Sequence, residues 1–518
     1  MPSPRQHRAT RLTAALSAVA LGLGLALVAG AGPAAQAADR PDVPTPAQQA
    51  LARAQALFDG TPATDRSGGA ASGPADATLA LRDLWALRGQ LTGADRAAAD
   101  ALLARPAAKR KACTPRICVH WTPSEVSKKD GDKNGRPDYV DKVIGNVDGV
   151  HRHYVKAGYR APKSDHGRGG NNKTDIYLRD VGQFGLYGYC DSDAKYFPSP
   201  SNHSVWAFCV LDNDYKSSQF PQNTPLENLQ VTAAHEYYHA VQFAYDFLED
   251  DWFMEASAAW AEDEVYDAVN DNKQYLASSP LTQPDIPLDS AADIEVYGGW
   301  IWFRYLTEKN PSLKGGMPVL LLRIWQAADS VGSGTDRYGV QAIQKVLNGK
   351  GSSLRDEFAR FSAANLFAQT AYDEGTAQAY PEVTPDFNAG LSDGQASSPS
   401  GTLDHLTAAT LRFRTQGTTS GATLAVSINL PDTTRGSAAV VTVNGNDGSH
   451  TPELVALDAN GNADTEVAFG DDVVTSVDVT LVNASTRFRC NQGTNFSCNG
   501  TPQDDGLTSS ASVEVLVP

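Results

Sequence analysis

Basic residues are scarce in this chain of 518 residues. Lys and Arg together number 43, against 60 Asp and Glu, so the formal net charge is −17 and the pI lies near 5.0. Nucleic acids and anionic membranes attract strongly basic surfaces, so this balance argues against both as partners. An acidic surface suits solubility and calcium-dependent stability outside a cell.

Long apolar runs are absent after the first residues. Beyond residue 28 no segment reaches the roughly 18 consecutive apolar residues of a membrane span, so the sequence predicts none. The first 37 residues combine three arginines, an apolar stretch over residues 12–28 and an A-x-A sequence ending at Ala37. This order is typical of a secretory signal peptide over residues 1–37, which predicts a secreted, extracellular protein.

Cysteine is also rare, with six in the whole chain. Six cysteines allow fifteen complete pairings. Export favours disulfides, and proximity along the chain predicts three of them: Cys113 with Cys118, Cys190 with Cys209, and Cys490 with Cys498. None of these residues lies near the histidines described next, which disfavours cysteine as a metal ligand there.

Glycine and proline are missing from residues 226–252, which indicates an uninterrupted helix. Just upstream, Thr224 offers a helix cap, Pro225 suits the first helical position, and Glu227 can complete a capping box. The sequence therefore predicts that a helix begins at this point.

That helix contains the sequence H-E-Y-Y-H at residues 235–239. His235 and His239 are four residues apart, so they project from one helix face and suit two ligands of one zinc ion. Glu236 lies between them and can take a proton from a water molecule. The pattern predicts a zinc metallopeptidase that hydrolyses peptide bonds with Glu236 as the general base.

A catalytic zinc needs a third protein ligand, and the next helical stretch offers two carboxylates. Glu255 and Glu262 lie seven residues apart and share one helix face. On the residues alone, either carboxylate could complete the site.

Residues 252–262 resemble the E-G-x-A-x-Y-x-E segment of gluzincin peptidases, the group of thermolysin and aminopeptidase N. The resemblance implies that Glu255 is the third zinc ligand and that Glu262 orients a histidine through its other ring nitrogen. It departs from the family at Ala256, which stands where gluzincins have glycine.

Gluzincins also take a histidine or tyrosine from the domain after the metal helices as the donor to the oxyanion. The matching candidate is Tyr297, because Gly298 and Gly299 follow it and leave it at a conformationally free start of an apolar helix. Tyr297 is thus a candidate catalytic residue. The alternative, a packing role with a satisfied hydroxyl, stays open.

A second metal signature lies upstream, at residues 130–141. Oxygen donors occupy the positions of a wrapped calcium loop, with glycine at the sixth position and a backbone carbonyl at the seventh. The candidate ligands of a structural calcium ion are Asp130, Asp132, Asn134, Arg136 through its carbonyl, Asp138 and Asp141. A plain surface turn is the competing interpretation.

The predicted fold is an α+β zincin-like metallopeptidase domain over residues 112–395, with a mixed sheet, the active-site helix and a helical C-terminal subdomain. Strands are expected at residues 117–121, 175–178 and 204–211, the last as an edge that pairs with an extended substrate. Helices are expected from residue 302 to 367.

Residues 38–111 are alanine-rich and helical after residue 79, with a loose linker near residues 67–74. They are either a propeptide that masks the cleft, with a processing site at residues 109–111, or an N-terminal helical extension. Residues 392–400 are expected to link the catalytic domain to an all-β sandwich-like domain at 401–518. That accessory domain is a candidate binder of substrate or of a cell surface.

The leading hypothesis is a secreted zinc endopeptidase that acts on a peptide or protein substrate, with calcium as a second, structural metal. An aminopeptidase is less favoured, because no Gly-rich exopeptidase motif precedes the helix. The other alternative is a non-catalytic binding or adhesion protein stabilised by zinc and calcium.

Overall fold

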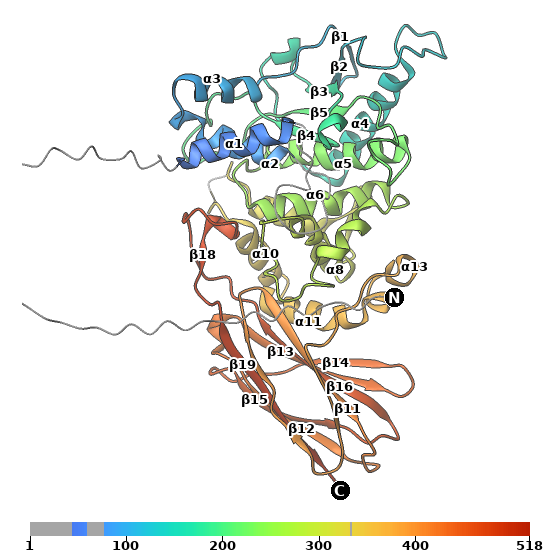
Figure 1. Ribbon diagram of the computed structural model, residues 1–518, viewed down its shortest axis with the longest axis vertical. Coiled ribbons are helices and arrows are strands. Elements are labelled where there is room, and N and C mark those ends of the chain that lie inside the picture. Colours follow the sequence, from blue (N-terminus) through green and yellow to red (C-terminus); the bar gives the residue numbers. More distant parts are fainter. Residues whose placement is uncertain (1–43, 60–76, 332–333) are drawn as a thin grey trace, which may run out of the picture. The chain divides into compact units, whose positions relative to one another are not determined.

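The computed structural model describes residues 44–59, 77–331 and 334–518 (Figure 1). The predicted signal peptide and the predicted linker near residues 67–74 lie outside these residues. The described part combines helices, a mixed sheet and a β-rich C-terminal region, and residues Thr45–Pro518 form one compact unit.

A mixed sheet of five strands forms the centre of the first half of the chain. Across the sheet the order is β1 (Arg110–Cys113), β2 (Ile117–Trp121), β3 (Thr174–Arg179), β5 (Phe208–Asp212) and β4 (Gly188–Asp191). Strands β2, β3 and β5 run parallel, whereas β1 and β4 pair antiparallel with their neighbours. The parallel strands are buried almost throughout, as their apolar sequences predict.

The edge of this sheet differs from the prediction. The strand expected at residues 204–211 begins later, at Phe208, and lies inside the sheet between β3 and β4. The edge on this side of the sheet is β4, a four-residue strand whose short sequence carries no clear alternation. It holds its place through its antiparallel ladder with β5, a non-local pairing that the sequence pattern alone does not reveal.

Helix α5 (Pro225–Gln242) packs on β4 and β5 and lies between the sheet and α6 (Asp251–Tyr266), as Figure 1 shows. The predicted capping box is present: the Thr224 side chain accepts from the Glu227 backbone N–H, and the Glu227 carboxylate accepts from the Thr224 N–H. The helix ends earlier than the absence of glycine and proline suggested, because the chain turns after Gln242 and the Phe243 carbonyl accepts from Val205.

Further helices surround these elements, and those within residues 302–367 agree with the helices that the sequence predicts there. Their bounds are α4 (Asp138–Ala157), η5 (Asp271–Ser278), α7 (Glu295–Gly298), α8 (Trp300–Glu308), α9 (Val319–Ala327), α10 (Gly339–Asn348), α11 (Leu354–Ala364), η6 (Asn365–Phe367), α12 (Ala368–Ala371) and α13 (Gly375–Gln378). Two short strands, β6 (Leu313–Lys314) and β7 (Met317–Pro318), form a hairpin before α9.

The N-terminal described residues are helical; the helices after residue 77 agree with the helix predicted from residue 79, whereas the helix at residues 46–58 was not predicted. They form α1 (Pro46–Phe58), α2 (Thr78–Leu87), η2 (Arg88–Gln90) and α3 (Gly93–Leu102). Helix α1 contacts both α2 and α3, and α2 contacts β4, so these helices lie beside the edge of the mixed sheet.

Two five-stranded sheets form the β-rich region and face each other across one hydrophobic core. One contains β10 (Ser400–Leu403), β19 (Leu507–Leu516), β12 (Thr423–Asn429), β15 (Asn462–Ala468) and β9 (Ala396–Ser397). The other contains β14 (His450–Leu454), β13 (Ser437–Gly445), β16 (Val474–Asn483), β11 (Thr407–Thr415) and β8 (Phe387–Leu391). A small hairpin, β17 (Phe488–Arg489) with β18 (Thr501–Pro502), completes the region.

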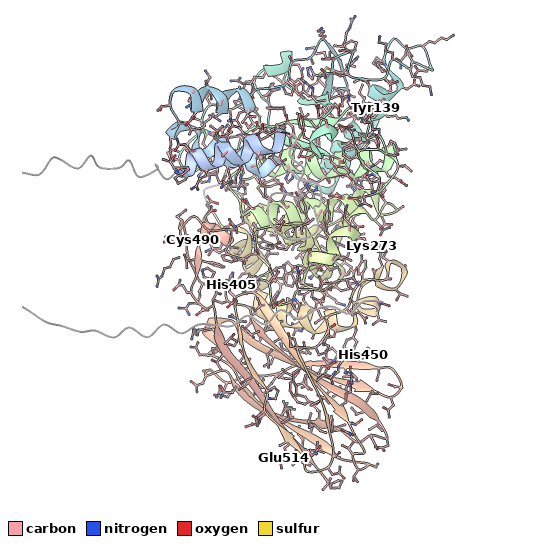
Figure 2. All side chains as sticks on the ribbon, viewed as in Figure 1. Tyr139, Lys273, His405, His450, Cys490 and Glu514 are labelled. Atoms are coloured by element: carbon pink, nitrogen blue, oxygen red, sulfur yellow. A yellow bond between two sulfur atoms is a disulfide. The ribbon has the colours of Figure 1, made fainter. Side chains whose placement is uncertain are left out.

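The β-rich region begins before the linker that the sequence predicted. Strand β8 pairs in parallel with β11, and β9 lies within residues 392–400, so this stretch belongs to the sheets. Helix α11 contacts β13 and β16, and Val440 and Val482 join the same hydrophobic core as the helices. Side chains therefore pack continuously between the helical region and the β-rich region (Figure 2).

All three predicted disulfides are confirmed. Cys113 is bonded to Cys118, Cys190 to Cys209, and Cys490 to Cys498. Among the described helices, none is both long and apolar enough to cross a membrane.

Candidate metal centre

The imidazoles of His235 and His239 face each other in the buried space between α5 and α6. Their Nε2 atoms lie 3.0 Å apart, and both side chains are almost fully shielded from solvent. The four-residue spacing on one helix explains why the rings meet. The prediction that one helix face presents both rings to one point agrees with this geometry.

The outer nitrogen of each ring is held by an acceptor, which determines where its proton lies. His235 Nδ1 is 2.6 Å from Glu262 Oε1, and His239 Nδ1 is 2.7 Å from Gln242 Oε1. The Gln242 amide nitrogen donates to the Met254 carbonyl, so its oxygen is free to accept from the histidine. Each Nδ1 therefore carries the proton in a neutral ring, and each Nε2 presents a lone pair.

Glu255 on α6 completes the cluster. Its Oε2 lies 3.1 Å from His235 Nε2 and 3.5 Å from His239 Nε2. Its other oxygen, Oε1, is buried without a hydrogen-bond partner in the described part of the chain. Of the two carboxylates that the sequence left open, Glu255 is the one that reaches both inner nitrogens, whereas Glu262 contacts only the outer nitrogen of His235.

Three acceptors that converge in a buried space are favourably placed around a positive charge. The three ligand atoms all lie within 4.8 Å of one another. Their separations of 3.0 to 3.5 Å bracket the edge of about 3.3 Å of a tetrahedron whose bonds are about 2.0–2.1 Å, the length of zinc–nitrogen bonds. Two imidazoles and one carboxylate thus fit a zinc ion that keeps an open position.

Glu262 sits in a strongly desolvated position behind His235. Burial is the main cause that raises its pKa, to about 7, and the hydrogen bond with His235 acts in the opposite direction. Asp271 is half-buried and lines the pocket beside the cluster, and desolvation raises its pKa as well.

A pocket opens beside the cluster and contains Glu236 and Tyr297. It is lined by Tyr187, Gly188, Val231, Thr232, His235, Glu236, Glu262, Asp271, Tyr275 and Tyr297. The Tyr297 ring lies 6.1 Å from the His235 ring and stacks on Tyr275 at 4.9 Å. The structure therefore brings the proposed base, the proposed oxyanion donor and one of the histidines to the same pocket.

Sequence reasoning missed several residues at this site. Gln242 is three residues after His239 on the same helix, so the helical repeat could have identified it. Tyr275 and Asp271 lie in η5, where no periodic pattern marks them, and tertiary packing alone brings them to the pocket.

Two glycines act through their lack of a side chain rather than through conformational freedom. A Cβ on Gly298 would lie 1.9 Å from the Ser278 carbonyl oxygen, so the end of α7 is a tight contact and not a conformationally free entry to α8. A Cβ on Gly299 would lie 3.2 Å from the Ala256 Cβ. The space for Ala256, which stands where gluzincins have glycine, thus comes from Gly299.

The predicted calcium loop is half-buried, exposed at residues 131–135, and bonded largely to itself. Asp130, Asp132 and Asp138 have oxygens close enough to share a cation. The Asp130 carboxylate accepts from the backbone N–H groups of Asn134 and Gly135. Gly135, the sixth residue of the loop, has a φ of 82°, the left-handed conformation that glycine favours there.

The remaining predicted ligands of the loop lie beside this group. Asp141 accepts from the Asn134 side-chain amide at 2.8 Å and from Arg136 Nε at 2.7 Å. Asn134 Oδ1 accepts from the Arg136 backbone N–H. The side chains of the loop are therefore satisfied by donors of the loop itself.

Comparisons with known proteins add no family. No family model and no curated protein matches the chain. Among solved structures, 26% of the chain is similar to 98% of the pre-peptidase C-terminal domain of collagenase from Bacillus anthracis, at 10% identity and a TM-score of 0.16. A second likeness joins 70% of the chain to 54% of a family GH115 4-O-methyl-alpha-glucuronidase with specificity for decorated arabinogalactans, at 8% identity and a TM-score of 0.14. TM-scores this low carry no argument about fold or activity.

Proposed function

We propose that the chain is a secreted zinc metallopeptidase of the gluzincin type, with a zincin-like fold around α5 and α6. The observation that carries the proposal is the convergence of His235 Nε2, His239 Nε2 and Glu255 Oε2. These groups would hold the metal, with both histidine tautomers fixed from behind. The disulfides support an extracellular location.

Zinc, when bound, supplies Lewis-acid activation of water and of the scissile carbonyl group. Glu236 lines the same pocket as His235, and its carboxylate is well placed to take a proton from a water molecule and to pass it to the leaving amine. Few water molecules reach a buried carboxylate. The proton that it has taken is therefore passed to the leaving amine rather than lost to solvent.

Tyr297 would act on the opposite side of the reacting carbonyl. Its ring is held by the stacking contact with Tyr275 and by the tight fit of Gly298 against Ser278. A fixed hydroxyl can donate to the oxygen that gains negative charge in the tetrahedral intermediate. Tyr297 is therefore the proposed oxyanion donor.

The edge strand β4 is the proposed binding surface for an extended peptide substrate. Gly188 lines the pocket, and a Cβ there would lie 3.0 Å from Glu236 Cγ, so the glycine lets the strand approach the catalytic helix closely. A peptide that pairs with such an edge gains backbone hydrogen bonds irrespective of its side chains. This mode of binding suits an endopeptidase that acts on unfolded protein.

The direct test compares the parent chain with Glu236→Gln. Because glutamine keeps the shape but cannot accept the proton, we expect unchanged zinc content and hydrolysis of an unfolded protein that is slower by about 10²–10⁴-fold. Zinc content is measured by elemental analysis and hydrolysis by release of new amino termini. Undiminished hydrolysis by the variant would exclude the mechanism, and zinc without hydrolysis by the parent would favour a binding protein.

A further inference from the structure

The helices α1 and α2 lie where an extended substrate would bind. Cys190 on β4 is directly opposite Cys209 on β5, with a Cα–Cα distance of 4.0 Å and a disulfide between them. So close a spacing marks a pair that exchanges no backbone hydrogen bonds across the ladder. The backbone N–H of Cys190 therefore points away from β5, to the open edge of the sheet.

Thr78, the first residue of α2, occupies that open edge. Its hydroxyl oxygen accepts from the Cys190 N–H at 2.9 Å, and its hydroxyl donates to Glu236 Oε2 at 3.3 Å. One side chain thus contacts both the edge donor that a substrate would use and the carboxylate proposed as the base. Thr78 is fully buried in this position.

Other side chains of the same segment are anchored on both sides of the pocket. Arg82 donates to the Glu249 carbonyl at 2.8 Å and pairs with Asp251, at the start of the helix that carries Glu255. Trp85 Nε1 donates to the Ala194 carbonyl at 2.8 Å, just beyond β4. These contacts extend from the metal-binding helix to the end of the edge strand.

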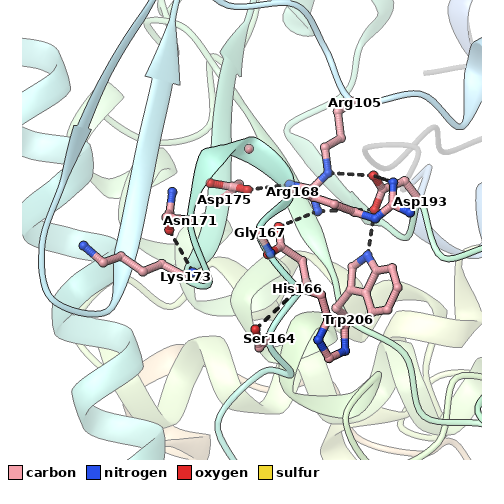
Figure 3. A network of polar contacts seen from close by, with 12 residues as sticks. Arg105, Ser164, His166, Gly167, Arg168, Asn171, Lys173, Asp175, Asp193 and Trp206 are labelled. Carbon is pink, nitrogen blue, oxygen red and sulfur yellow. Dashed lines mark hydrogen bonds and ion pairs between the residues drawn. The ribbon is translucent and has the colours of Figure 1, made fainter.

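The connection after α3 has the features of a cleavage site. Arg105 makes the last ion pairs before this connection. Its guanidinium pairs with Asp175 and Asp193 (Figure 3) and also with Asp165. Residues 107–111 are exposed, and residues 105–108 have no regular secondary structure. Exposed, irregular backbone is the kind that proteases cut. Of the sequence K-R-K at residues 109–111, only Lys109 belongs to this stretch, because Arg110 and Lys111 lie in β1.

We propose that the helices α1, α2 and α3 mask the substrate edge and the base, and that cleavage after Lys109, just before β1, releases them. This inference rests on the proposed function and decides between the two interpretations of the N-terminal residues in favour of the mask. The cleavage is hydrolysis of one peptide bond by a protease specific for basic residues; it consumes one water and leaves one new carboxyl and one new amino terminus. After release, the Cys190 N–H and Glu236 become available to a peptide.

The test uses the full chain with the recognition sequence of a site-specific protease inserted between Ala107 and Ala108. The same sample is compared before and after the cut, at nanomolar concentration so that a released segment leaves. Hydrolysis of an unfolded protein is one measurement, and hydrogen–deuterium exchange of the β4 amides is the other. We expect the cut to increase both rates by roughly tenfold or more.

A matched pair of variants tests the contact itself in the uncut chain. Thr78→Val keeps the shape but removes both hydrogen bonds, so exchange at the Cys190 amide is expected to become about tenfold faster, the effect of losing a buried hydrogen bond. Thr92→Val is the control, because Thr92 is exposed and its side chain caps no helix. It should leave the exchange of β4 unchanged.

Each outcome decides the inference. Faster β4 exchange after the cut, without any hydrolysis, would support the mask and contradict the peptidase. Equal exchange before and after the cut would show that the segment is not released and would overturn the mask, even if both samples hydrolyse protein. A cut chain that no longer shows a thermal unfolding transition would also overturn it, because the segment would then be part of the folded body.

Discussion

The two metal sites that the sequence predicted differ in how their acceptors are satisfied. The cluster of His235, His239 and Glu255 is buried, and its inner acceptors face one another. The loop at residues 130–141 is only partly buried, and the Asp130 carboxylate accepts from backbone N–H groups of the same loop. A cation would therefore contribute more to the electrostatic balance of the first region than to that of the second.

The difference shows that residue spacing alone does not rank metal sites. Both patterns bring oxygen or nitrogen donors together, but burial decides how much a cation contributes. Between buried donors, a bound ion offsets a large desolvation cost, whereas exposed carboxylates keep much of their water. We therefore expect the loop to bind calcium weakly and the buried cluster to bind zinc tightly.

The largest effect should follow the loss of the bridging carboxylate. Glu255→Gln replaces a charged ligand with a neutral amide, and we expect zinc affinity to fall by roughly a thousandfold or more. The measurement is competition with a chromophoric chelator. Asp132→Asn in the exposed loop is the control, and equal losses in the two variants would break the distinction between the regions.

A smaller effect is expected from the groups that hold the outer histidine nitrogens. Gln242→Leu removes the acceptor of His239 Nδ1, and Glu262→Gln weakens the acceptor of His235 Nδ1. Outer partners of this kind change metal affinity by about 10–100-fold. Competition with the same chromophoric chelator measures this change in zinc affinity. If Glu262→Gln lost zinc as completely as Glu255→Gln, Glu262 would be a ligand rather than an orienting group.

The smallest effect concerns calcium. Adding calcium at about ten times its Kd should raise the thermal midpoint by about 1–3 °C, and a calcium-selective chelator should reverse the rise. Asp130→Asn should abolish this response while zinc content stays constant. A midpoint that ignores calcium in the parent chain would identify the loop as a plain surface turn.

Local signals made the metal helix predictable. Its capping box, its uninterrupted helical sequence and the four-residue spacing of the histidines all act within one helix, and α5 has them where expected. The disulfides were predictable for the same reason, since each joins residues close in the chain. Glu255 and Glu262 could be proposed together, but only the packing of α6 on α5 distinguishes their contacts.

Non-local pairing explains what could not be predicted. Strand β4 is short, and its place at the edge depends on β5, so the sequence pattern favoured the wrong strand. Strand β8 pairs in parallel with β11, where Phe387 lies opposite Leu411, and it falls within the bounds 112–395 that were predicted for the catalytic domain. The contact of Thr78 with Glu236 joins residues 158 positions apart, a separation at which no periodicity gives information.

Anomalous X-ray scattering from a crystal of the full chain, at energies on both sides of the zinc absorption edge, tests the central claim most directly. We predict one zinc peak per chain, with His235 Nε2, His239 Nε2 and a Glu255 oxygen each about 2.0–2.2 Å from it. A zinc-supplemented crystal without a peak at this position, or with its zinc bound only by the loop at residues 130–141, would contradict the account.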